Sequence, residues 1–266
     1  MKWLIAAAAL ALVVVVMSFG FGGRKGHALN VVGSTSIQPF AEMLAQAYQE
    51  SHPGQYVDVQ GGGSTAGIQA AENGLAEIGM CSRALKKEEA GVFTPNIIAY
   101  DGLAIVVHPS NPVEGLTLQQ IQGIFAGQVA NWQEVGGPDR PIRLITREEG
   151  SGTREAFTKL VMQKLRISRK ALTQESNGAV KELVKHDACA IGYMSLGLVM
   201  GELRSLKVDG VPATHEDVSA KRYPLVRPFL FVTKGKPTEA AQGFIDYVFS
   251  EPGQALLAKE GLVRVR

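Results

Sequence analysis

The chain has 266 residues, of which 45% are hydrophobic and 20% charged, and its formal net charge is +2. This is the composition of a globular protein: the aliphatic content excludes a disordered chain, and two cysteines are too few for a disulfide-stapled mini-protein. The length allows two lobes that each bury a core. Residues 1–28 hold three basic and no acidic side chains, so the remaining 24 basic and 25 acidic side chains nearly cancel. No nucleic-acid partner is therefore expected.

Residues 1–28 have the features of a secretion signal. Lys2 precedes an apolar run over residues 3–21, and Gly26-His27-Ala28 provides small residues around a cleavage point. The run is also close to the roughly 20 residues that span a bilayer, so an uncleaved N-terminal membrane anchor is the alternative. In either case, we expect export by the Sec route, with residues 29–266 in the periplasm, free or tethered to the inner membrane.

The periplasm is an oxidising compartment, so Cys81 and Cys189 of an exported chain could form a disulfide. The sequence does not show whether their geometry permits the bond. Both cysteines lie in apolar, strand-like segments, and we expect two small buried thiols without a functional role. The five histidines share no ligand spacing with the cysteines or acids, which argues against a metal site. No cofactor is expected.

From residue 29 onward, short β-like runs alternate with longer amphipathic segments. The predicted strands are 29–33, 56–60, 76–80, 143–147, 190–195 and 229–233. The predicted helices are 38–50, 65–73, 153–164, 179–185 and 238–249. Strands and helices in alternation indicate an α/β fold with mostly parallel sheets.

Four turns that lead into predicted helices combine glycine with Ser, Thr or Asn. They are residues 33–36, 61–65, 150–153 and 176–178. Glycine lets the backbone approach a ligand, a hydroxyl can cap the helix or donate outward, and N–H groups at a helix start favour an anion. One such turn is usually only a helix cap. Four turns at the carboxyl edge of strands indicate an anion-binding site, because open α/β sheets bind ligands at that edge.

The segment from Arg147 to Thr153 is the most specific of the four. Arg147 ends a predicted strand and can bind an oxyanion through its forked guanidinium, and Glu149 is close enough in sequence to hold that group in place. Ser151 and Thr153 offer hydroxyls, while Gly152 and Thr153 offer backbone N–H groups. The alternative is an exposed Arg/Glu turn in which Ser151 only caps a helix.

The common catalytic motifs do not match. Gly61-x-Gly63-x-x-Ala66 resembles a dinucleotide fingerprint but lacks the acidic residue at the end of the next strand, and no Gly-Lys-Ser/Thr phosphate loop follows. Neither Ser64 nor Ser151 lies in a Gly-x-Ser-x-Gly elbow or has a histidine in a recognisable pattern as its base. We therefore do not expect an enzyme, and a secreted hydrolase is disfavoured.

Taken together, these motifs resemble the phosphate-binding proteins of bacterial phosphate ABC transporters, the PstS-like family, over residues 29–266. The matching segments are Val32-Gly33-Ser34-Thr35-Ser36, Gly61-Gly62-Gly63-Ser64-Thr65, Ile78-Gly79-Met80-Cys81-Ser82-Arg83, Tyr100-Asp101-Gly102, Arg147 to Thr153, Ala190-Ile191-Gly192-Tyr193 and, for structural reasons, Trp132 to Gly137. The resemblance implies an α/β, two-lobed periplasmic-binding-protein fold of type II, a Venus flytrap with two hinge crossings. Lobe 1 would comprise residues 29–104 plus 228–266, and lobe 2 residues 105–227.

By match of position, the resemblance implies a phosphate site built from both lobes. Its residues would be Thr35, Ser36, Ser64, Ser82 and Arg83 on one side and Arg147, Ser151, Gly152 and Thr153 on the other. The best-known members have an Asp at the position of Ser82, where it accepts the proton of hydrogen phosphate and so rejects sulfate. Because this chain has a serine there, Asp101 is the candidate proton acceptor. The alternative is that Asp101 only structures the hinge.

The resemblance thus implies high-affinity capture of inorganic phosphate outside the membrane and its delivery to an ABC transporter permease, by hinge closure around the oxyanion. The protein would act as a monomer. One alternative is a binding protein for another tetrahedral oxyanion: sulfate, molybdate or tungstate. A second alternative is a membrane-tethered phosphate-sensing protein, which requires the leader to remain attached.

Overall fold

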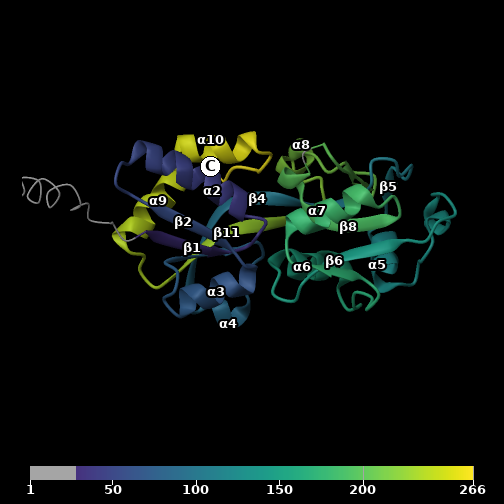
Figure 1. Cartoon of the computed structure of the whole chain (residues 1–266), viewed down its shortest axis with the longest axis horizontal. Coiled ribbons are helices and arrows are strands. Elements are labelled where there is room, and N and C mark those ends of the chain that lie inside the picture. The colour runs from purple at the N-terminus through teal and green to yellow at the C-terminus, as the bar shows by residue number, and fades with distance from the viewer. Residues whose placement is uncertain (1–27, 200, 266) are drawn as a thin grey trace, which may run out of the picture.

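The structure is a computed structural model that describes residues 28–199 and 201–265. The predicted leader therefore lies outside the described residues, except for Ala28. Among the helices that are described, none is both long and apolar enough to cross a membrane. Figure 1 shows two lobes side by side along the long axis of the molecule, connected by strands β4 and β11.

Lobe 1 contains the first and last parts of the described chain, packed around one apolar core. Phe40 and Leu44 of a helix pack in this core with Phe231 and Phe244. The elements of lobe 1 are β1 (Leu29–Gly33), α2 (Gln38–Ser51), β2 (Val57–Gly61), α3 (Ser64–Glu72), β3 (Ile78–Cys81), α4 (Lys87–Ala90), α9 (Glu239–Phe249) and α10 (Glu251–Lys259). Strand β1 pairs in parallel with both β2 and β3.

Lobe 2 is formed by the middle of the chain around a second, aromatic core. Trp132 is fully buried there, and its indole N–H donates to the carbonyl of Cys189 over 3.0 Å. The elements of lobe 2 are β5 (Gly115–Leu116), α5 (Leu118–Ala126), η1 (Trp132–Val135), β6 (Arg143–Arg147), α6 (Gly152–Phe157), η2 (Thr158–Met162), β7 (Leu172–Gln174), α7 (Asn177–His186), β8 (Ala190–Ser195), η3 (Leu196–Leu198), β9 (Arg204–Ser205), β10 (Lys207–Val208) and α8 (His215–Ser219). Strand β6 pairs in parallel with β7 and β8.

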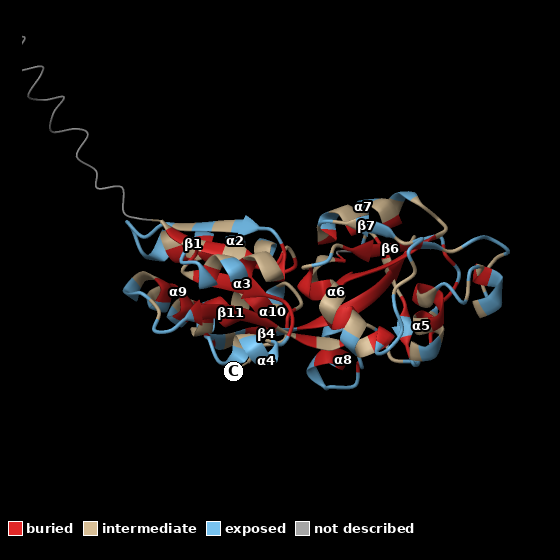
Figure 2. Ribbon diagram, turned by 90° about the horizontal axis from the view of Figure 1, so that it is seen from below, coloured by how far each residue is buried: buried red, intermediate tan, exposed pale blue. Residues whose placement is uncertain are grey.

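Two long strands connect the lobes, and they make the two sheets continuous. Strands β4 (Phe93–Val107) and β11 (Val226–Lys234) are antiparallel neighbours, and the strand order is β2-β1-β3-β11-β4-β8-β6-β7. Ile98 and Ala99 of β4 pack in the core of lobe 1, whereas Leu103 and Ile105 pack in the core of lobe 2. The chain therefore passes from one core to the other near Gly102. Figure 2 shows buried residues along the strands of both lobes.

The predicted strands 29–33, 143–147 and 190–195 are confirmed with their predicted bounds, and the fold is the predicted two-lobed α/β type. The sheets are parallel within each lobe, but the crossing strands β4 and β11 are antiparallel to their neighbours. The helix predicted over 153–164 is instead α6 followed by a π-helical turn that ends at Met162. The division at residues 104/105 and 227/228 stays a prediction.

The two cysteines are free thiols in different lobes. Cys81 ends β3 and is buried, and burial raises the pKa of its thiol. Cys189 precedes β8 and is partly exposed. The expectation of a buried thiol therefore holds for Cys81, whereas Cys189 is less buried than predicted.

Candidate oxyanion-binding site

The predicted turns meet where the two lobes touch. Ser36 Oγ lies 2.7 Å from Thr153 Oγ1, and Asn177 Nδ2 donates to Ser36 Oγ over 2.9 Å. The backbone N–H of Thr65 donates to the carbonyl of Gly150 over 3.0 Å. Each of these hydrogen bonds joins lobe 1 to lobe 2, so the structure has the lobes in a closed arrangement.

Lobe 1 contributes serine hydroxyls that do not cap helices. Gly63 precedes α3 with a φ of +91°, a conformation that favours glycine, and the Ser64 side chain makes no capping bond. Ser64 Oγ instead accepts the backbone N–H of Ser82 over 3.0 Å and lies 3.4 Å from Ser82 Oγ. Ser36, Ser64 and Ser82 are all buried. Their hydroxyls therefore converge on the lobe interface and not on helix ends.

Lobe 2 contributes the start of α6. Ser151 Oγ caps this helix by accepting the backbone N–H three residues further on, which leaves its hydroxyl hydrogen able to donate. The N–H groups of Gly152 and Thr153 lie in the first helical turn, where the helix supplies no acceptor for them. A Cβ on Gly152 would collide with Ser64 Oγ and lie 2.8 Å from Ser82 Oγ, so only glycine permits this approach of the lobes.

Arg147 supplies a buried guanidinium at the end of β6. Its Nε and Nη2 donate to the carboxylate of Glu148 over 2.9 and 3.0 Å, and Nη2 also donates to Thr35 Oγ1 over 3.1 Å. Nη1 is buried and has no hydrogen-bond partner among the described residues. Because an unsatisfied buried donor is costly, Nη1 is suited to donate to a ligand oxygen.

The carboxylate that holds Arg147 belongs to Glu148, so the prediction that Glu149 holds it is wrong. The side chain of Glu149 is 95% exposed and pairs with Arg154 over 3.1 Å. Arg154 in turn donates to the backbone carbonyl of Arg147. One position along this turn decides which glutamate faces the guanidinium.

The hydroxyls of Ser36, Ser64, Ser82 and Thr153 at the lobe contact form the hydroxyl cluster. The hydrogen bonds of the Arg83 guanidinium go to other residues. Its Nη1 and Nη2 donate to Glu89 over 2.7 and 2.8 Å, and its Nε lies 2.9 Å from Glu155 Oε2. Glu155 belongs to α6 of lobe 2 and also lies 3.2 Å from Lys86 Nζ. Arg83 therefore joins the two lobes through ion pairs.

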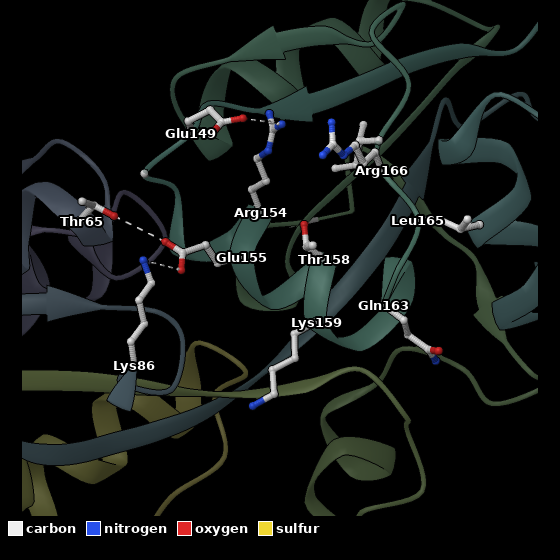
Figure 3. Close-up of a pocket in the computed structure, with 12 residues that line it drawn as sticks. Thr65, Lys86, Glu149, Arg154, Glu155, Thr158, Lys159, Gln163, Leu165 and Arg166 are labelled. Atoms are coloured by element: carbon white, nitrogen blue, oxygen red, sulfur yellow. Dashed lines mark hydrogen bonds and ion pairs between the residues drawn. The ribbon is translucent and has the colours of Figure 1, made fainter. Parts of the chain in front are cut away.

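A pocket of about 770 Å³ opens beside these ion pairs. Figure 3 shows Thr65 and Lys86 of lobe 1 directed toward Glu155 of lobe 2, with Arg154 and Lys159 further along the wall. Residues from both lobes thus line this pocket, and it borders the lobe contact without including the buried serines.

Asp101, the predicted proton acceptor, is fully buried and already has hydrogen-bond donors on both oxygens. Its Oδ2 accepts from Arg227 Nε over 3.0 Å and lies 2.9 Å from Arg227 Nη2, and its Oδ1 accepts the hydroxyl of Ser195 over 2.8 Å. Burial raises the pKa of Asp101, and the positive charge of Arg227 opposes that shift. This arrangement on β4 and β11 fits the alternative expectation of a carboxylate that structures the hinge.

Two side chains of the cluster were not among the predicted site residues. Arg227 is buried in β11, and its Nη1 and Nη2 donate to Thr153 Oγ1 over 2.7 Å and to Ser36 Oγ over 3.2 Å. The sequence signal for it is a basic residue directly before the apolar run Pro228 to Val232 of this strand. Asn177 lies in a turn that the sequence singled out, but no ligand contact was predicted for its side chain.

The cluster is electrically balanced although it holds two buried arginines. Arg147 is paired with Glu148, and Arg227 is paired with Asp101. The formal charges of these four groups cancel. Attraction for an anion must therefore come from hydroxyl and N–H dipoles directed at one point, together with the free Nη1 of Arg147.

Comparison with known proteins places this chain in a defined class. A family model described as a PBP superfamily domain matches residues 22–252. The phosphate-binding protein PstS of Bacillus subtilis is 30% identical over 248 residues, which are 91% of this chain and 82% of that protein. PstS of Borreliella burgdorferi is 26% identical over 251 residues, 90% of each chain.

Two similar solved structures are named as phosphate transport proteins as well. A putative phosphate ABC transporter substrate-binding protein from Clostridium perfringens, determined with bound phosphate, has a TM-score of 0.87 and 42% identity, covering 90% of this chain and all of its own. An ABC-type phosphate transport receptor from Vibrio cholerae has a TM-score of 0.75 and 37% identity, covering 88% of this chain and 99% of its own. The chain belongs to the PstS-like family of the PBP superfamily.

Proposed function

We propose that this protein captures inorganic phosphate between its lobes and delivers it to an ABC transporter permease. The observation that carries the proposal is Arg147 Nη1, a buried donor with no hydrogen-bond partner among the described residues, on a guanidinium that also reaches Thr35 of the other lobe. The relatives from Bacillus subtilis and Borreliella burgdorferi are named phosphate-binding proteins, and the Clostridium perfringens protein holds phosphate.

Binding would use donors from both lobes at once. Thr35, Ser36, Ser64 and Ser82 would line the site from lobe 1, and Arg147 with Ser151, Gly152 and Thr153 from lobe 2. A phosphate held by both sets stabilises the closed arrangement over an open one, because opening would break its bonds to one lobe. Arg83 is not included, since its guanidinium is occupied by Glu89 and Glu155.

The proposed setting is outside the cytoplasmic membrane, with the protein acting as a monomer, as a carrier and not as an enzyme. This setting is supported by the basic and apolar leader in the sequence and by the transport proteins among its relatives. The permease would recognise the closed form, which differs from the open form in the position of one lobe relative to the other.

Calorimetric titration of the purified protein with phosphate tests the proposal. We expect one phosphate per chain, because the relatives that name a ligand are phosphate-binding proteins, and sulfate and molybdate are titrated as competitors. Binding of sulfate or molybdate in place of phosphate would instead assign the protein to the other oxyanions.

A further inference from the structure

Arg227 contacts the proposed phosphate site from behind, at the crossing between the lobes. It lies on β11 and is only 2% exposed. On the side of the site, its guanidinium donates to Thr153 Oγ1 of lobe 2 and to Ser36 Oγ of lobe 1. On the other side, it donates to the carboxylate of Asp101 on β4. One side chain thus contacts a hydroxyl from each lobe.

The number of lone pairs determines how these two hydroxyls can act. A hydroxyl has two lone pairs and one hydrogen. Ser36 Oγ accepts from Arg227 Nη2 and from Asn177 Nδ2, over 3.2 and 2.9 Å, so both of its lone pairs are used. Its hydrogen must therefore be the one shared with Thr153 Oγ1 over 2.7 Å.

Both lone pairs of the Thr153 hydroxyl are then used as well. Its Oγ1 accepts from Arg227 Nη1 over 2.7 Å and from the hydroxyl of Ser36. With both lone pairs used, its own hydrogen can only be donated elsewhere. When an oxyanion lies between the lobes, Thr153 can donate its hydrogen to it while Ser36 keeps donating to Thr153, and neither oxygen then has a lone pair with which to accept a ligand hydrogen.

The Ser82 hydroxyl, on the opposite side of the site, still has lone pairs that can accept a hydrogen. Ser82 Oγ receives no N–H donor among the described residues, and its only hydrogen-bond neighbour is Ser64 Oγ at 3.4 Å. Its lone pairs are therefore available to accept a hydrogen from a ligand. One wall of the site is restricted to donation, and the other can both donate and accept.

We propose that Arg227 is a positioning residue that sets the protonation state of the bound ligand. By filling acceptor positions on Ser36 and Thr153, it makes that wall suited only to unprotonated oxygens, and the hydroxyl of hydrogen phosphate faces Ser82. The proposal rests on the proposed function of phosphate capture. It predicts selection of the phosphate dianion, which has one protonated oxygen, over the monoanion, which has two.

The surroundings of Arg227 keep its guanidinium in one orientation. Asp101 binds two of its nitrogens, and the ring of Phe229 lies 5.2 Å from its central carbon. The other ionisable groups whose charges act on the pKa of Arg227 are Arg147 on β6, which lowers it, and Cys81 on β3, which raises it. A lysine at this position can still pair with Asp101, but its single ammonium cannot reproduce the fork that serves both hydroxyls.

The test compares phosphate affinity of wild type and Arg227→Lys by calorimetry between about pH 5.5 and about pH 8, where phosphate passes from monoanion to dianion. For the wild type, we expect affinity to fall steeply as the monoanion replaces the dianion. For Arg227→Lys, we expect dianion affinity to fall about tenfold or more and the pH dependence to become shallower, since the freed lone pairs can accept a ligand proton. Arg222→Lys is the matched control, because Arg222 is an exposed arginine paired with Asp217.

Two outcomes would overturn the role of Arg227: unchanged affinity, or a loss of equal size at every pH, which a purely structural residue would cause. If Arg227→Lys fails to fold, the paired variant Asp101→Asn with Arg227→Gln replaces the ion pair by neutral groups and is measured in the same way. Absence of phosphate binding by the wild type would contradict the proposed function. Wild-type binding with an unaltered pH profile in the variants would contradict only the role of Arg227.

Discussion

Replacement of Arg147 with Ala is expected to weaken phosphate binding by about 30-fold to about 5,000-fold, which corresponds to about 2–5 kcal/mol for the loss of a buried charged donor. The guanidinium is 1% exposed, and its Nη1 has no partner within the described protein. Removing it also releases Thr35 Oγ1, which lies 3.1 Å from Nη2. Calorimetric titration with phosphate measures the loss.

The matched control for this variant is Arg143→Ala. Arg143 lies on the same strand β6, but its side chain is 56% exposed and pairs with Asp187 at the surface. Its removal should leave phosphate affinity within about twofold of wild type, since exposed ion pairs contribute little. If Arg147→Ala bound phosphate as tightly as Arg143→Ala, Arg147 would not be part of the site.

Gly152→Ala should weaken phosphate binding by about 5-fold to about 150-fold, the equivalent of about 1–3 kcal/mol of overpacking. The added methyl group collides with Ser64 Oγ and lies 2.8 Å from Ser82 Oγ. Both serines belong to lobe 1 and Gly152 to lobe 2, so the collision occurs only when the lobes close. Without phosphate the variant should therefore unfold at a temperature close to that of wild type.

Thermal unfolding with and without phosphate distinguishes this effect from misfolding. Wild type should be stabilised by phosphate through mass action, and Gly152→Ala much less at the same concentration. Gly178→Ala is the control, because Gly178 also lies in the first turn of a helix near the site, yet an added Cβ there comes no closer than 3.7 Å to any atom. Equal stabilisation of Gly152→Ala and wild type by phosphate would show that the closed contact is absent in the bound form.

The parts of the site that lie in one short segment can be predicted from sequence. The run from Arg147 to Thr153 combines a strand end, a turn and a helix start, so its donors must lie within a few ångströms of each other. Arg227 is different, because its contacts with Thr153, Ser36 and Asp101 join residues that are 74, 191 and 126 positions away. The register of β11 against β4 pairs Arg227 with Asp101, and the packing of the two lobes brings Ser36 and Thr153 to it; local periodicity encodes neither.

Elements that depend on local sequence were also predicted better than elements that depend on pairing with a distant strand. Strands β1, β6 and β8 are short apolar runs that end at turns, and their bounds follow from composition. The first half of β4 contains Pro95 and Asn96, which do not favour a strand, and it forms one because β11 pairs along it. Even within a single turn, sequence spacing did not predict which of Glu148 and Glu149 pairs with Arg147, because the backbone geometry of the turn selects the partner.

The bond from the Thr65 N–H to the Gly150 carbonyl has a consequence for amide hydrogen exchange. Thr65 is in the first turn of α3, where the helix offers its amide no acceptor, so this amide depends on a carbonyl of the other lobe. When the lobes separate, that acceptor leaves while the helix remains folded. The exchange rate of this single amide therefore reports how often the lobes open, independently of the unfolding of either lobe.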